Sequence, residues 1–375
     1  MDLLGGALDY LIPFLVVLTV LVFVHEWGHY AIARRNGVKV EVFSIGFGPE
    51  IFGFNDKSGT RWKFSLIPLG GYVKMFGDAD VVSRPDGSTR TMSAEERAVS
   101  FHHKSIAQRA AIVLAGPMAN FVFAIIALTF LFMAAGHPFP PPVVGAVQPD
   151  SAADIAGIEA GDRVVRFDGQ SVHRFADLSS LVQRTEGLEA AVVLRRPGDG
   201  TVSVTVTPQP AIVTLANGEE QEIYRLGVSA STEPVGPLQA ATGAVTETVA
   251  LSWLTLSAIG EMIVGARGTE ELGGPIRIAQ ISGDVAQFGI IALIWLMAIL
   301  SINLGLINLM PVPMLDGGHL MFYAVEAIRG RPLGERAQEY GFRIGLALVL
   351  TLMVFATWND LVQLEVVSYL RDLLF

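Results

Sequence analysis

Residues 8–33, LDYLIPFLVVLTVLVFVHEWGHYAIA, form an apolar run that carries two histidines and a glutamate in its second half. A helix of this length can cross the hydrocarbon core of a bilayer, which is roughly 30 Å thick. Ionisable groups inside such a run are costly, and they usually serve a function. The run therefore predicts a membrane-spanning helix with a chemical site near its C-terminal end.

The composition extends this prediction to the whole chain. Of its 375 residues, 51% are hydrophobic and 17% are charged, and the mean hydropathy is +0.48, whereas soluble domains carry about 25% charged residues. Further apolar runs cover residues 106–135, 290–309 and 342–357. We therefore expect a polytopic α-helical membrane protein with about four transmembrane helices, the fourth of them short. The net charge of −10 argues against nucleic acid as a partner, and the absence of cysteine excludes disulfides and thiolate metal sites.

His25, Glu26 and His29 form an H-E-x-x-H motif. Residues four apart share one face of a helix, so both imidazoles can reach one metal ion, and the glutamate beside them can act as a general base. A catalytic zinc site usually takes three protein ligands. Asp316 is the best candidate for the third ligand, because a carboxylate directly after an apolar span needs a partner and the following Gly-Gly pair lets the backbone turn. A helix-capping role for Asp316 is the alternative.

Between the first two apolar runs, residues 38–77 alternate like β-strands and are too polar to span a membrane. We expect strands at 38–43, 50–54, 60–65 and 71–76, folded as a β-hairpin region that dips into the cytoplasmic leaflet. A helix attacked at such a site would first have to unwind, because helical peptide bonds are already hydrogen-bonded, and the edge of this sheet near Gly70, Gly71 and Tyr72 could then form hydrogen bonds with the unwound backbone. A merely structural hairpin is the alternative.

Residues 140–210 have the pattern of an α+β domain inserted between the second and third spans. The expected elements, in order, are strand 143–147, helix 151–158, strand 163–167, helix 175–184, and strands 190–195 and 201–207. This order and the run GIEAGDRVVRFDGQSV at 157–172 resemble a PDZ domain, a fold that binds extended peptides and peptide termini at a sheet edge. A small β-rich domain without a ligand is the alternative.

Basic residues indicate how the spans are oriented. Arg34 and Arg35 follow the first span, Lys104 and Arg109 flank the second, and four arginines at 329–343 lie between the third and fourth. Because cytoplasmic flanks are rich in lysine and arginine, we expect both termini and the insert outside the cytoplasm. His25 lies 14 residues beyond residue 11, or about 21 Å along the helix, which leaves the metal site roughly 9 Å from the cytoplasmic face.

A helix is also expected at 237–264, where an apolar stretch is interrupted by acidic and threonine side chains. If this helix crossed the membrane, Asp316 would lie on the face opposite to His25, since the two ligand segments must end on the same side. We therefore interpret the helix as an amphipathic, interfacial one.

The H-E-x-x-H motif, the run NLMPVPMLDGG at 308–318 and the PDZ-like insert together resemble the site-2 protease family, most closely its bacterial RseP type. The segments GFGP at 46–49, IPLGGYVKM at 67–75 and FHHKSIAQRAAIVLAGPMANF at 101–121 agree with this resemblance. The resemblance implies a zinc ion held by His25, His29 and Asp316 and activation of water by Glu26. It also implies that a substrate is held in part by Asn308, Pro311 and Pro313.

For the whole protein, the resemblance implies cleavage of single-span membrane proteins within the bilayer of the bacterial inner membrane. Such substrates are already trimmed outside by an earlier protease, and anti-sigma factors are an example. Some proteins of the RseP type carry two tandem PDZ domains, whereas the sequence shows one here.

Two other functions remain open at this stage. A different membrane zinc protease would take a glutamate as its third ligand, and a PDZ scaffold or a transporter would need no zinc. In either case the expected divisions of the chain are 1–36 (first span), 37–104 (hairpin region), 105–136 (second span), 140–210 (PDZ-like domain), 211–285 (hairpin and interfacial helix), 286–325 (third span) and 326–375 (loop, fourth span and C-terminal segment).

Overall fold

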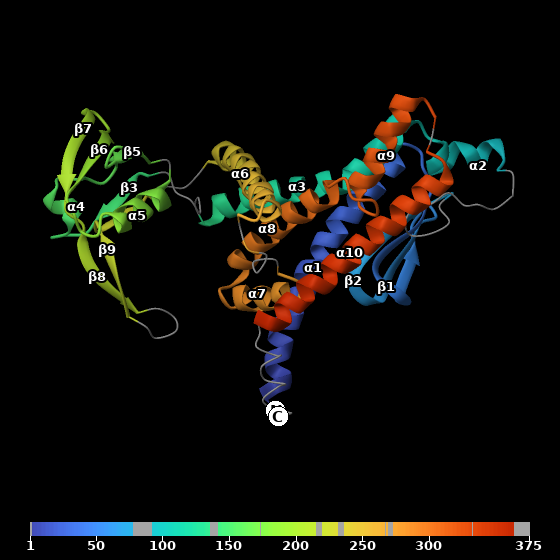
Figure 1. Cartoon of the computed structure of the whole chain (residues 1–375), viewed down its shortest axis with the longest axis horizontal. Helices are drawn as coiled ribbons and strands as arrows, with labels where there is room; N and C mark the ends of the chain where they lie inside the picture. The colour runs from blue at the N-terminus through green and yellow to red at the C-terminus, as the bar shows by residue number, and fades with distance from the viewer. Residues whose placement is uncertain are drawn as a thin grey trace. The chain divides into compact units, whose positions relative to one another are not determined.

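Two compact units make up the chain, one from residues 1–128 and 244–375 and the other from residues 129–243 (Figure 1). The computed structural model describes residues 2–77, 92–135, 142–172, 174–214, 220–231, 236–266, 268, 273–331 and 333–363. The first unit holds the long helices and the hairpin, and the second holds the inserted α+β domain.

Four helices of the described chain are long and apolar enough to cross a membrane. The helices are α1 (Asp2–Arg35), α3 (Ile106–Ala135), α8 (Ile290–Leu309) and α10 (Glu335–Gln363), and the spans within them are Leu8–Arg35, Ile106–Ala134, Ile290–Leu309 and Arg336–Val362. This count confirms the prediction of a polytopic helical membrane protein.

The fourth span is longer than its apolar run suggested. It covers 27 residues, from Arg336 to Val362, instead of 342–357. The apolar run begins only after the polar first turns of α10, but these turns are helical too, and Glu339 and Arg343 within them form an i,i+4 ion pair of 2.7 Å. The expectation of a short fourth span was therefore wrong.

The segment after α8 turns sharply into a further helix that the sequence did not reveal, α9 (Asp316–Arg329). Pro311 and Pro313 end α8, and Met310 already has an extended backbone. A Cβ atom on Gly317 or Gly318 would overlap the backbone of Leu309, Met310 or Val312, so only glycine permits this close approach. The tight turn places Asp316 in the first turn of α9.

The hairpin region consists of β1 (Val40–Asn55) and β2 (Arg61–Met75), whose ends pair at Val40–Met75 and at Asn55–Arg61. The four strands expected from the sequence are confirmed as segments of β1 and β2, because residues 42–45 pair with 71–74 on one side and with 61–64 on the other, and residues 50–55 pair with 61–65. The Asp56 carboxylate accepts hydrogen bonds from Tyr30 Oη (2.9 Å) and Trp62 Nε1 (3.1 Å), which fastens the hairpin turn to α1.

The two halves of the hairpin differ in environment. Near its base, Val40, Phe43 and Val73 are buried in a core that includes Phe101 and Ile112. The distal half exposes large apolar side chains, namely Ile51, Phe52, Phe54, Phe64, Leu66 and Ile67. These exposed side chains form an apolar surface of the kind that a membrane covers.

After the inserted α+β domain and before α8, the described chain forms two helices, α6 (Pro237–Ile263) and α7 (Pro275–Gln287). The four candidate spans do not include α6, and its interfacial location stays a prediction. The sequence did not reveal α7, whose N-terminus is capped from a distance: the Asp360 carboxylate of α10 accepts hydrogen bonds from the backbone N–H groups of Gly274 (2.8 Å), Ile276 (3.1 Å) and Arg277 (3.1 Å).

The second unit closely follows the predicted order of elements. It contains β3 (Val144–Val147), α4 (Ala152–Ile155), β4 (Arg163–Phe167), β5 (Gln170–Ser171), α5 (Phe175–Arg184), β6 (Ala190–Arg196), β7 (Gly200–Val206), β8 (Gln209–Thr214), β9 (Glu220–Arg225) and β10 (Val228–Ala230). The sheets have the orders β5-β4-β6-β7, β10-β3 and β8-β9. Strand 163–167 and helix 175–184 are confirmed with their predicted bounds.

The core of this unit continues past residue 210, the limit expected from the sequence. Leu226 is buried with Phe167, Leu178 and Val192, and β10 pairs with β3 through Val228 and Val147. A strand of three residues is too short to show alternation, and its partner lies about 80 positions earlier, so the sequence pattern could not reveal it.

Candidate functional site

Two neighbouring elements of the first unit bring the predicted metal ligands together. His25 and His29 lie one turn apart on α1, and Asp316 begins α9. The Nε2 atoms of the two histidines are 3.2 Å apart; Asp316 Oδ2 lies 3.2 Å from His25 Nε2, and Asp316 Oδ1 lies 3.6 Å from His29 Nε2. One ligand atom from each of the three residues fits within 4.8 Å, so together they can hold a metal ion.

The surroundings of these atoms fit a zinc ion. His29 Nδ1 lies 2.9 Å from the carbonyl oxygen of Ile112, which can only accept, so the proton of a neutral ring is on Nδ1 and the lone pair is on Nε2. Asp316 Oδ2 is buried and receives no hydrogen bond. Two imidazole nitrogens and a carboxylate facing one point form a common donor set for catalytic zinc.

Glu26 lies in the same cavity as the three candidate ligands, and the cavity has a volume of about 230 Å³. Strand β2 passes close beside this glutamate: a Cβ atom on Gly71 would lie 3.3 Å from Glu26 Cγ and 2.6 Å from the carbonyl oxygen of Ser44. A glycine at position 71 therefore leaves room for the Glu26 side chain next to the hairpin.

The predicted substrate contacts fall into two groups. Gly71, Tyr72 and Asn308 line the cavity, so the hairpin and the end of α8 both reach it. Gly70 does not line it and faces the Phe47 ring, with a φ of +129° that favours glycine. Pro311 and Pro313 lie outside the lining as well, and Pro313 packs its backbone against Gly345 of α10. Roles in substrate binding stay predictions for all of these residues.

Three residues of the site were missed by the sequence reasoning. His319 lines the cavity one turn after Asp316. Gly116 of α3 lies against the His29 ring, and Asn120, one turn further along α3, has its amide nitrogen 3.2 Å from His25 Nδ1. The signal was present in the run GPMAN at 116–120, since an asparagine is costly inside an apolar span.

Comparison with known proteins identifies the family to which this site belongs. Residues 13–352 match the profile of peptidase family M50. The chain belongs to this family. Because that family binds zinc, zinc is the metal of this M50 chain, and the resemblance to site-2 proteases is confirmed.

Relatives of this M50 chain cover it almost from end to end. A protein of Agrobacterium fabrum named as a zinc metalloprotease is 46% identical over 368 residues, which is 96% of this chain and 97% of that protein. A Rickettsia conorii protein with the same kind of name is 37% identical, over 94% and 99% of the two chains. The regulator of sigma-E protease RseP of Salmonella typhimurium is 32% identical over 459 aligned positions, covering 94% of this chain and 98% of that protein. That alignment is longer than the 375 residues here, so RseP carries residues that this chain lacks.

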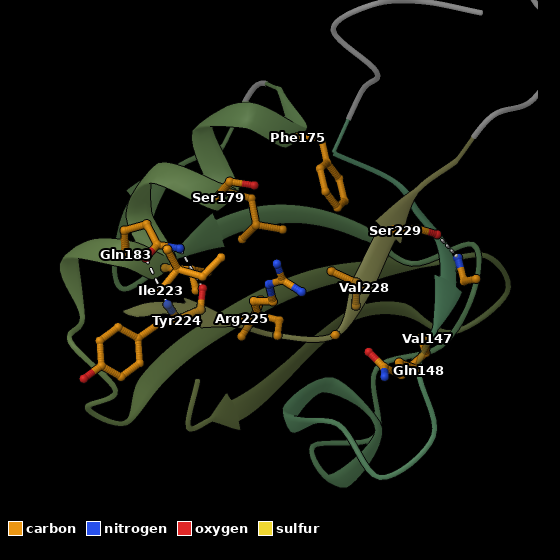
Figure 2. A pocket seen from close by; sticks show the side chains of 15 residues that line it. Val147, Gln148, Phe175, Ser179, Gln183, Ile223, Tyr224, Arg225, Val228 and Ser229 are labelled. Atoms are coloured by element: carbon orange, nitrogen blue, oxygen red, sulfur yellow. Dashed lines mark hydrogen bonds between the residues drawn. The ribbon is translucent and has the colours of Figure 1, made fainter. Parts of the chain in front are cut away.

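A second cavity of this M50 chain lies within the inserted unit, between α5 and the strand segment 223–229, and has a volume of about 550 Å³ (Figure 2). Phe175, Leu178 and Val182 of α5 form its apolar side. Among the described strands, β10 pairs with β3 on one edge only. Figure 2 shows the Arg225 side chain reaching into the space between α5 and Val228.

Gln183 closes one end of this groove. Its amide nitrogen donates to the carbonyl oxygen of Tyr224 (2.7 Å), and its amide oxygen accepts from the Tyr224 N–H (3.0 Å) (Figure 2). The side chain thereby occupies both backbone groups of Tyr224, as a neighbouring strand would.

Proposed function

We propose that the chain is an intramembrane zinc endopeptidase that hydrolyses a peptide bond within the transmembrane segment of single-span membrane proteins. One observation carries this proposal: the ligand atoms of His25, His29 and Asp316 fit within 4.8 Å, beside Glu26 and in a unit with four candidate membrane spans. Membership of a zinc metalloprotease family supports the same conclusion.

In the proposed site His25, His29 and Asp316 hold the zinc ion. When bound, the ion polarises the carbonyl group of the scissile bond and makes a water molecule more acidic. Glu26 takes a proton from the water as its oxygen attacks the carbonyl carbon. The same carboxyl group then gives this proton to the amine nitrogen as the C–N bond breaks. A glutamate in the cavity of the three ligands is well placed for both transfers.

The substrate segment must lose its helical hydrogen bonds before its carbonyl group can enter the site. We propose that β2 near Gly70, Gly71 and Tyr72 supplies replacement backbone hydrogen bonds, and that Asn308 holds the unwound segment from the other side. The positions of Gly71, Tyr72 and Asn308 around the cavity support this arrangement. Pro311 and Pro313 would act indirectly, by fixing the turn that presents Asp316.

We further propose that the protein lies in the bacterial inner membrane, with the metal site near the cytoplasmic face and the inserted unit in the periplasm. The basic residues that flank the spans support this orientation. The exposed apolar side chains of the distal hairpin, from Ile51 to Ile67, support its insertion into the cytoplasmic leaflet. On the opposite face, α6 would lie along the membrane surface.

The inserted unit is proposed to be a PDZ-like domain that binds the extended end of a peptide. The free edge of β10, the apolar side of α5 and the Arg225 cation support an occupant with apolar side chains and a carboxylate. Ser179→Trp would fill the groove from the exposed face of α5 and should weaken binding of a fluorescent peptide with a free apolar C-terminus by at least tenfold. Gln170→Trp, outside the groove, is the control. Equal peptide binding by both variants would contradict the proposal that the peptide binds in this groove.

The substrates proposed here are membrane proteins trimmed outside beforehand, such as anti-sigma factors in a stress-signalling pathway. Support for this class comes from the similarity to a protein named as a regulator of sigma-E protease. The inserted unit would then admit trimmed substrates and exclude those with an intact outer domain.

The decisive experiment is a comparison of zinc content and cleavage in reconstituted membranes. Glu26→Gln should keep its zinc, lose cleavage and retain bound substrate for identification, whereas His25→Ala should lose zinc. Full activity of the Glu26→Gln variant would refute the mechanism. Zinc retained by Asp316→Ala would favour a membrane protease with another third ligand, and a wild-type protein without zinc would favour a scaffold or a transporter.

A further inference from the structure

Asn120 contacts the proposed metal site without being one of its ligands. Its side chain is completely buried on α3, its amide nitrogen is 3.2 Å from His25 Nδ1, and its amide oxygen is buried with no hydrogen-bond partner. We propose that Asn120 is a positioning residue for His25, an inference that rests on the proposed zinc site. It accepts a hydrogen bond from His25 Nδ1–H through its amide oxygen and so keeps the Nε2 lone pair directed at the metal.

The requirement of the metal ligand decides the orientation of the amide group. Amide oxygen and nitrogen have nearly the same shape, and their assignment follows from their partners. If the Asn120 nitrogen donated to His25 Nδ1, the proton of the neutral ring would sit on Nε2 and block the lone pair that a metal needs. Turning the amide by 180° places its oxygen on Nδ1–H. The amide oxygen has no partner among the described residues in the orientation of the structure, so that orientation is not fixed by a second hydrogen bond and the tautomer of His25 decides.

The second histidine is held in the same way from the same helix. His29 Nδ1 lies 2.9 Å from the carbonyl oxygen of Ile112, an atom that can only accept. Ile112 precedes Asn120 by eight residues on α3, whereas His29 follows His25 on α1. The two helices therefore run antiparallel past each other, and each histidine meets a hydrogen-bond acceptor of α3. Hydrogen bonds of this kind fix the tautomer and the ring orientation of zinc-ligating histidines.

Asn120 is itself held in place by α8. The Ser301 hydroxyl donates a hydrogen bond of 2.9 Å to the backbone carbonyl of Asn120, and both residues are completely buried. A fixed backbone at Asn120 limits the positions that its amide group can take. The contact therefore gives His25 a rigid partner, as a positioning role requires.

The test compares a variant that removes the acceptor with one that retains only an acceptor. Zinc affinity is measured by competition with a chromogenic chelator on the full-length protein in detergent. Asn120→Leu has a similar volume and no acceptor, and it should bind zinc about 10- to 100-fold more weakly. Asn120→Asp has a carboxylate that accepts and does not donate, and its zinc affinity should stay within about threefold of wild type or increase. The absorption spectrum of the cobalt-substituted Asn120→Asp variant should match that of wild type.

Asn303→Leu provides the matched control, because Asn303 lies on α8 and contacts Thr255 instead of a histidine (2.9 Å). Its zinc affinity should be unchanged. Wild-type zinc affinity in a folded Asn120→Leu variant would overturn the proposal. A tenfold or greater loss of zinc affinity in Asn120→Asp would also overturn the proposal, since it would show that the amide group of Asn120 donates to His25. The Asn120→Asp result is sufficient for this decision even if Asn120→Leu does not fold. If the wild-type protein bound no zinc, the proposed function would fail instead.

Discussion

Replacing Gly116 by alanine should damage the metal site, although residue 116 is not among its candidate ligands. A Cβ atom built on Gly116 overlaps the His29 imidazole at Nε2 and Cε1 and lies 2.9 Å from its Cδ2. Ordinary contacts between carbon atoms lie at about 3.5–4.0 Å, so the ring has to move by roughly 1 Å or α3 has to withdraw. Both movements change the position of the proposed zinc-ligating nitrogen.

The expected effect of Gly116→Ala combines two opposing effects on the stability of the fold with one effect on the geometry of the metal site. Alanine is favoured over glycine inside a helix by roughly 0.5–1 kcal/mol. Overpacking of a buried interface costs about 1–3 kcal/mol. The net destabilisation is then about 0–2.5 kcal/mol, which a domain with a stability of about 5–15 kcal/mol survives. The site is more sensitive, because metal–ligand distances tolerate only about 0.2 Å.

The expected result is a folded protein with zinc affinity reduced about 10- to 100-fold and cleavage reduced by about 100-fold even at saturating zinc. Zinc affinity is measured by chelator competition and cleavage in proteoliposomes. Gly260→Ala is the control for helix propensity, because Gly260 is also helical and a Cβ atom there meets nothing within 4 Å. If Gly116→Ala bound zinc within threefold of wild type and cleaved substrate normally, close packing of α3 against His29 would not determine the position of this ligand.

Three further expectations concern the base, the inserted unit and the topology. Gly71→Ala would place a methyl group 2.6 Å from the Ser44 carbonyl oxygen, 2.8 Å from Val22 Cγ1 and 3.3 Å from Glu26 Cγ. Strand β2 then has to shift beside the base, so cleavage should fall about 10- to 100-fold while zinc affinity stays unchanged; a parallel loss of zinc would contradict an effect on the base alone. In the inserted unit, the hydrogen bonds from Arg196 hold the pKa of Asp162 below its usual value near 3.9. A lowered folded-state pKa stabilises the fold above about pH 4, and this stabilisation is lost as the pH falls through the folded-state pKa. Hydrogen-exchange protection of β4 and β6 should therefore drop on acidification in wild type and drop less in Asp162→Asn. Equal drops in the two proteins would refute a stabilising role of the Asp162 carboxylate. Cysteines introduced at the exposed positions Ser58 and Ser171 should label from opposite sides of the membrane, Ser58 from the cytoplasm, and labelling of both from one side would rule out the proposed orientation.

Local periodicity was sufficient to predict the long helices and most of the proposed metal site. The apolar runs at 106–135 and 290–309 have the same bounds as α3 and α8, because a continuous apolar run of this length is the feature that hydropathy detects directly. The pair His25 and His29 follows from helical spacing alone. Asp316 required chemical reasoning about an unpaired carboxylate, and the structure brings it to the two histidines.

Features that depend on distant partners were not predictable in this way. Asn120 and His25 are 95 positions apart, and β10 pairs with a strand about 80 positions earlier. The cap that Asp360 provides to α7 joins residues 83–86 positions apart. In each case a distant partner gives the residue or segment its role, and the local sequence does not show which partner that is.

The contacts of α3 assign separate tasks to the helices around the metal site. The candidate ligands come from α1 and α9, whereas α3 contributes the carbonyl oxygen of Ile112 to His29, the proposed amide acceptor of Asn120 to His25, and a glycine surface between them. A helix that only filled space could accept any apolar side chain at position 116 or 120. A helix that sets the tautomers of two histidines cannot, because each acceptor determines which nitrogen is free for the metal. Loss of zinc affinity on changing α3 alone, with all three ligands intact, would therefore separate a positioning role from simple packing.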